Sequence, residues 1–196
     1  MARYQAIAAT GQAVLGLLMD ACPKPEFEGA RFELYQASDF QKPMDDGISL
    51  YLYRIAVNGA IRNTPPRVMP NGQRKLPPLP LELYYTLTPW AKTAARQQRL
   101  LGWAMRMLED MPVLPSGVLN NYGPERDVFG APDTVEVILE SLSLQDMSNL
   151  WNAAKIAPSL SAYYIARVVA IDALSDSTTD QPLVQAREFD MTRGPV

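Results

Sequence analysis

The chain has 196 residues, of which 47% are hydrophobic, and a formal net charge of −3, so a single domain with one substantial core is expected. It contains no histidine and a single cysteine, Cys22, which excludes histidine-based triads, most zinc sites and any disulfide within one chain. A pI of about 5.0 means that no overall positive field recruits nucleic acid.

The N-terminal 22 residues have the length of a secretion signal but not its pattern. Polar or small residues at 10–12 (TGQ) interrupt the apolar run, and Asp20 stands where a signal would need a neutral end. No stretch approaches the roughly 20 uninterrupted apolar residues of a membrane span. Apolar residues at helical spacing instead predict a helix that ends at Pro23. We expect a soluble protein made in a reducing cytosol, with Cys22 as a small core residue.

Three runs in the first half have strand character. Residues 31–36 (RFELYQ) form a short candidate, and residues 81–88 alternate cleanly between apolar and other side chains. The run 48–57 is apolar on both faces, because Ile48, Leu50 and Leu52 share one face whereas Ile55 and Val57 share the other. This pattern predicts either a central strand covered on both sides or a strand with a bulge midway.

The second half alternates helices and strands. Thr88 and Pro89 predict a helix start, as N-cap and first-turn residue, and the stripe behind them ends at Pro112. The stripe consists of Leu100, Trp103, Ala104, Met107, Leu108 and Met111. A turn-rich loop at 115–132, a strand at 135–142, a helix at 144–155 and a long strand at 162–173 follow.

This order of elements predicts an α/β (α+β) fold with a mixed, largely antiparallel sheet flanked by helices. We expect residues 1–175 to form the domain. Residues 176–196, poor in large apolar side chains, are expected to be a tail that is flexible or becomes ordered on assembly.

The sequence offers no convincing catalytic, metal or cofactor residues. Glu109 and Asp110 are adjacent on a helix and project about 100° apart, so they cannot share one substrate atom. The phosphate-binding and nucleophile motifs GxxxxGK[ST], GxGxxG and GxSxG are all missing from the sequence. We therefore predict a protein that is not an enzyme.

Two connections remain as candidate contact surfaces. Residues 58–80 carry Arg62, Arg67, Arg74 and Lys75 with no acidic residue, and six prolines that limit their freedom. A long connection of this kind is either a solvated loop or an interaction element, and the second is favoured because ordered domains seldom keep one without use. Nucleic acid is a weaker alternative, since no aromatic residue is interleaved to stack on bases.

Four segments together resemble one known family. They are LYLYRIAVNGAIRN (50–63), PLPLELYYTLTPWA (78–91), QQRLLGWAMRMLEDMPVL (97–114) and NLWNAAKIAPSLSAYYIARVVAIDA (149–173). In this order they are similar to the tail-terminator, or cap, proteins of phage-tail-like contractile injection systems, over roughly residues 1–175.

The resemblance implies a structural protein with a phage tail-terminator-like fold. Relatives form a ring, usually hexameric, that terminates the inner tube and anchors the last sheath layer. Expected partners are further copies of the chain, the inner tube protein and the sheath protein, without nucleic acid or membrane insertion. The resemblance also implies assembly in the bacterial cytoplasm and presence in the particle, either inside the cell or outside it after release.

Two other readings stay open beside this one. The first is a terminator or tube-end adaptor of an ordinary phage tail. The second is a small ligand-binding domain or enzyme, which would need a deep pocket lined by perturbed carboxylates.

Under the cap hypothesis the candidate residues take specific roles. Arg62, Arg67, Arg74 and Lys75 would contact the tube or sheath rim and set register more than affinity. Residues 120–132, with Tyr122, Arg126 and Phe129, would contact the neighbouring subunit. In the tail, residues 182–189 (PLVQAREF) have enough strand propensity to add to an exposed sheet edge of a neighbour or of a sheath subunit, although disorder until binding is an equal alternative.

Overall fold

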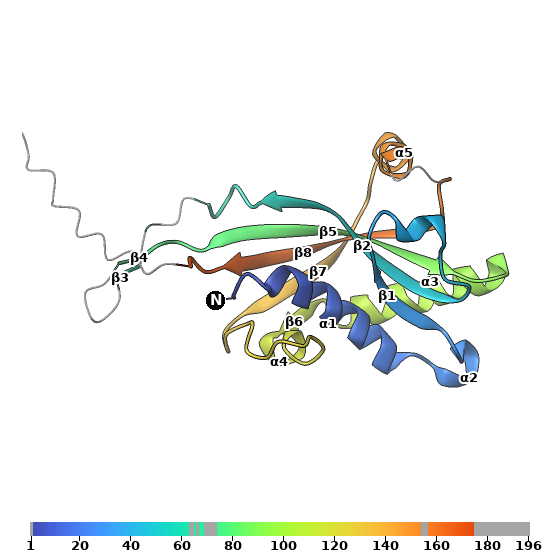
Figure 1. The fold of residues 1–196 in the computed structure, drawn as a ribbon, viewed down its shortest axis with the longest axis horizontal. Helices are drawn as coiled ribbons and strands as arrows, with labels where there is room; N and C mark the ends of the chain where they lie inside the picture. Colours follow the sequence, from blue (N-terminus) through green and yellow to red (C-terminus); the bar gives the residue numbers. More distant parts are fainter. Residues whose placement is uncertain (1, 63–64, 66, 69–73, 154–156, 175–196) are drawn as a thin grey trace, which may run out of the picture.

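The computed structural model describes residues 2–62, 65, 67–68, 74–153 and 157–174, and Figure 1 shows the fold. Six strands form one sheet in the order β1-β2-β5-β8-β7-β6. Strands β1 and β2 are parallel, and every other neighbouring pair is antiparallel. The strands are β1 (Arg31–Tyr35), β2 (Gly47–Val57), β5 (Leu79–Trp90), β6 (Val113–Pro115), β7 (Thr134–Glu140) and β8 (Ala162–Ile171). The predicted fold class is confirmed.

Helices lie on both sides of this sheet. On one face, α1 (Ala6–Ala21) and α3 (Ala94–Asp110) enclose the main core, with the short α2 (Lys24–Phe27) and α4 (Ser116–Leu119) beside them, whereas α5 (Leu144–Ala153) lies on the other face (Figure 1). There Trp151 of α5 packs edge-on against Phe40 of a 3₁₀ turn (Asp39–Gln41), with ring centroids 5.7 Å apart. Both sheet faces are therefore covered at this end of the molecule.

A bulge resolves the two-faced pattern of β2. The pairing of β2 with β5 shifts between Leu52 and Arg54, so one extra residue reverses the alternation of side chains beyond it. Ile55 and Val57 pair with Leu83 and Leu81, and they therefore lie on the same face as Leu52, the face that α1 covers. The bulged alternative for this strand is confirmed.

The predicted start of the helix that ends before Pro112, which is α3, is wrong. Thr88 and Pro89 belong to β5, and α3 begins at Ala94 with Thr93 as its N-cap, whose hydroxyl oxygen accepts from the Arg96 N–H at 3.3 Å. Proline is tolerated in β5 because β8 pairs with that strand only as far as Leu87, so the missing N–H of Pro89 removes no bond to β8.

The two predicted connections contain short elements. Residues 58–80 include the strand pair β3 (Arg67–Val68) and β4 (Arg74–Lys75), and their last two residues open β5. Residues 115–132 include α4. The predicted tail at 176–196 and the end of the predicted helix at 154–155 lie outside the described residues.

Candidate interaction surfaces

The end of the sheet away from α3 projects beyond the helices. Strands β2, β5 and β8 extend there toward β3 and β4, as Figure 1 shows. Within the described residues no helix covers the apolar row on the α1-side face, where Ile55, Val57 and Leu79 are 46%, 41% and 47% exposed. We call this three-stranded end, with its apolar row, the blade.

The basic connection emerges from the tip of the blade, and Asn58 fixes its root. The Asn58 backbone N–H donates to the Pro80 carbonyl at 2.9 Å, and its side-chain amide donates to Glu82 at 3.1 Å. Its carbonyl oxygen accepts from the Ala60 N–H at 3.0 Å, an Asx-type turn that orders the first residues of the connection.

The four predicted cations lie in the residues that follow Asn58. Arg62 is exposed in a turn, and Arg67 pairs with Lys75 while Val68 pairs with Arg74 in the β3–β4 ladder. The backbone thus places three of the four basic residues in one hairpin. Their contact with a tube or sheath stays a prediction.

The second connection is tied to the body more closely than the sequence suggested. The Tyr122 hydroxyl donates to the Asp20 carboxylate at 2.8 Å, and partial burial, then Asp20, raises the pKa of Tyr122. Phe129 is only 4% exposed and packs in the main core, because Asn120 binds its backbone N–H and carbonyl, both at 2.9 Å. Of the three residues predicted to contact a neighbour, Arg126 is exposed, Tyr122 half-buried and Phe129 unavailable at the surface.

A polar and aromatic cluster on the α5 side of the blade was missed by sequence reasoning. Glu82 accepts from the Tyr84 hydroxyl at 2.9 Å and pairs with Arg167 at 3.6 Å. Tyr53 donates to Glu140 at 3.4 Å, and burial, then Glu140, raises the pKa of its hydroxyl. The cluster is spread over β2, β5, β7 and β8, so no local motif could reveal it; the only available signal was the alternation of polar residues along each strand.

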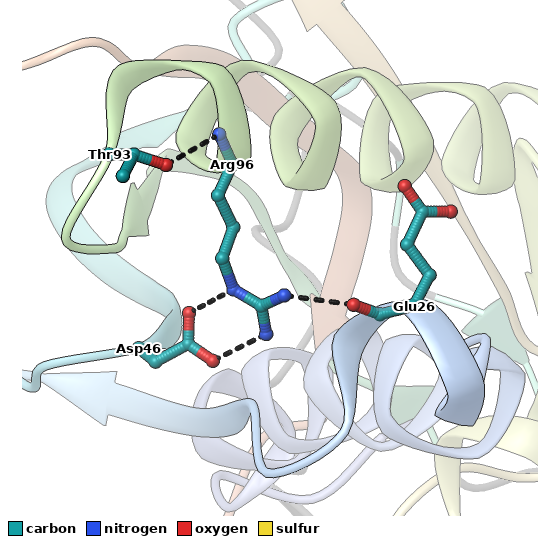
Figure 2. A network of polar contacts seen from close by, with 4 residues as sticks. All are labelled: Glu26, Asp46, Thr93 and Arg96. Carbon is teal, nitrogen blue, oxygen red and sulfur yellow. Dashed lines mark hydrogen bonds and ion pairs between the residues drawn. The ribbon is translucent and has the colours of Figure 1, made fainter.

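The best-formed ionic contact among the described residues has a structural role. Figure 2 shows Arg96 of α3 donating two bonds of 2.7 Å to Asp46 and one of 2.8 Å to the Glu26 carbonyl. Its guanidinium also lies 5.6 Å from the Phe27 ring centre. The contact ties α3 to α2 and to the start of β2, and every partner of Arg96 is already engaged within the fold.

The part of the chain that the structure describes offers little for metal or membrane chemistry. No group of three or more Cys, Asp or Glu side chains there is placed to hold a metal ion. No helix among the same residues is long and apolar enough to cross a bilayer.

The fold is that of tube-terminating proteins of contractile injection systems. It is similar to the PVC sheath/tube terminator of an extracellular contractile injection system in its extended state, with a TM-score of 0.61 at 14% identity over 87% of this chain and 58% of that one. It is also similar to the tube-terminating cap of the anti-feeding prophage, with a TM-score of 0.54 at 17% identity over 82% and 54% of the two chains.

The chain belongs to the Pvc16 N-terminal domain family, whose model matches residues 23–185. The predicted resemblance to the tail-terminator family is thereby confirmed. The chain spans a little over half the length of the two solved structures. No curated protein sequence matches it.

Proposed function

We propose that this chain is the structural cap of a contractile injection system, forming a ring that ends the inner tube and anchors the last sheath layer. The observation that carries the proposal is the family match over residues 23–185, together with the shared fold of two solved proteins described as a sheath/tube terminator and a tube-terminating cap. Under this proposal the chain assembles in the bacterial cytoplasm and remains in the particle.

The shape of the surface supports a role in contacts with a repeating edge. The blade and its basic connection project from the body, and a projecting element reaches a neighbouring subunit without a concave pocket. In a ring, each copy needs only a modest contact, since tied contacts gain avidity that a single one lacks. The four cations of residues 58–80 would set register and encounter rate at an acidic rim.

The test is electron microscopy of particles made with altered caps. Deleting residues 63–77 should leave tubes and sheaths without an end density, while the isolated protein keeps its melting temperature within error. The deletion removes Arg67, Arg74 and Lys75, and a charge-matched variant replaces three exposed basic residues elsewhere, Arg3, Lys24 and Arg99, by Ser. It should cap normally. Normal capping by the deletion variant would remove the basic connection from the mechanism, and tubes of regulated length in particles lacking the whole chain would overturn the function.

The contact between copies has its own test. Arg126 is exposed on the second connection, and reversing its charge with Arg126→Glu should lower the mass of the assembled ring measured by native mass spectrometry. An unchanged mass would indicate that the interface between copies lies elsewhere on the body.

A further inference from the structure

The blade has one closed edge and one open edge. On the β8 side Ala2, the first described residue, closes it, because its N–H donates to the Ala170 carbonyl at 3.1 Å and its own carbonyl accepts from the Asp172 N–H at 2.8 Å. On the β2 side, β1 pairs only as far as the Tyr35–Tyr51 position. From residue 52 to 57, β2 therefore has β5 on one side and no strand among the described residues on the other. Unpaired strand edges are normally covered, charged or bulged.

The open edge is also apolar. Ile55 and Val57 are nearly half exposed and lie on the α1-side face of this edge. Beside them a groove of about 480 Å³ runs between the N-terminal half of α1 and β2, with Leu52 and Gln5 in its wall. An apolar row beside a strand edge that no described strand covers suits the addition of an extended peptide.

We propose that residues 182–189 (PLVQAREF) of the same chain fill this position, adding as an antiparallel strand to the 52–57 edge of β2. The last described residue, Leu174, lies just beyond β8, whose end pairs with Leu79. Crossing from β8 to the far side of β2 takes three strand spacings, about 14 Å. The seven residues at 175–181 span up to about 23 Å when extended, so the connection is long enough.

Direction and charge agree with this occupant. Both β2 and β8 run antiparallel to β5, so a chain that leaves β8 and turns back lies antiparallel to β2. Residues 175–190 contain four acidic side chains and one basic one, while Arg54 on the open edge and Arg62 in the turn beyond its end are exposed. The family model also continues to residue 185, so the family domain includes part of this segment.

Hydrogen–deuterium exchange of the full chain tests the proposal without reference to capping. In the variant carrying Leu183→Asp and Val184→Asp, the outward amides at 54–57 should exchange at least tenfold faster than in the native chain. The control carries Thr178→Asp and Thr179→Asp, the same added charge in the connecting residues, and should exchange at the native rate. The native protection should not depend on protein concentration.

A cross-link distinguishes the source of the strand. With Cys22 replaced by Ser, a short bis-maleimide should join Val57→Cys to Leu183→Cys within one monomer. It should not join Leu139→Cys, a similarly exposed position on β7 (44% against 41%), to the same partner. Equal exchange in all three chains would overturn the proposal. Protection that rises with concentration, or cross-links found only in dimers, would overturn it in favour of a strand supplied by a second copy.

Discussion

The Arg96–Asp46 contact should be the main polar determinant of stability at the body of the domain. Arg96 lies in the first turn of α3, where a positive charge is unfavourable for the helix dipole, and Asp46 supplies the compensating carboxylate through two bonds of 2.7 Å. The two side chains are 25% and 28% exposed, so solvent screens the pair only in part.

Replacing Arg96 by Ala removes three hydrogen bonds from a charged donor and leaves the Asp46 carboxylate partly buried without its partner. Charged hydrogen bonds contribute about 1.5–3 kcal/mol each before solvation of the freed groups is counted. Since water reaches both sites, we expect a net loss of about 2 kcal/mol in the free energy of unfolding. For a domain of this length such a loss lowers Tm by about 4–8 °C.

Thermal unfolding followed by circular dichroism measures this change, and Arg106→Ala is the matched control. Arg106 lies on the same helix and pairs with Asp110, but the pair is well exposed, so its loss should move Tm far less. Combining Arg96→Ala with Asp46→Ala should reveal a coupling energy of about 1–2 kcal/mol. A Tm for Arg96→Ala equal to that of Arg106→Ala, or fully additive single variants, would refute the reasoning.

Three further predictions concern pH and close packing. Burial raises the pKa of Tyr164 to about 12, whereas a tyrosine in the unfolded chain ionises near its ordinary pKa of about 10. The stabilisation is therefore complete below about pH 10 and should be lost between about pH 10 and 12, as urea unfolding at each pH would measure. A Cβ at Gly47 would lie 2.0 Å from the Arg31 carbonyl oxygen at a φ of +140°, so Gly47→Ala should cost more than about 1 kcal/mol in urea unfolding, and a neutral result would contradict the register of β1 and β2. A Cβ at Gly16 would lie 2.1 Å from the Tyr122 ring; Gly16→Ala should therefore cost about 1–3 kcal/mol, and it should cost much less in a Tyr122→Ala background if that ring is the obstacle.

Most strands could be predicted from the sequence because their signal is local. The alternation at 81–88 marks a strand, and β7 (TVEVILE) alternates in the same way. β8 is instead a nearly continuous apolar run, and its first five residues are buried. The helix start was misplaced for the opposite reason. Whether a strand can continue through Pro89 depends on which strand pairs with β5 at that point. Pairing between distant segments cannot be predicted from the local sequence pattern.

For the candidate surfaces too, local features could be predicted from the sequence and long-range contacts could not. The basic character of residues 58–80 is a property of composition and was visible. The burial of Phe129 was not, because it follows from two bonds made by the Asn120 side chain nine residues away. The Tyr53–Glu140 contact joins residues 87 positions apart, and only the strand order brings them together.

The arrangement of the blade separates stability from contact. Its tip is anchored by Asn58 and by the pairing of β2 with β5 along almost their whole length, so changes in residues 63–77 should leave the core between α1, α3 and the sheet intact. The charge of such a projecting surface can change to match a partner without weakening the domain. Substitutions at Asp46 or Gly47, where β2 starts, instead act on the stability of the domain. Variants of the connection should therefore lose binding at an unchanged Tm, and variants at the start of β2 should lose Tm first.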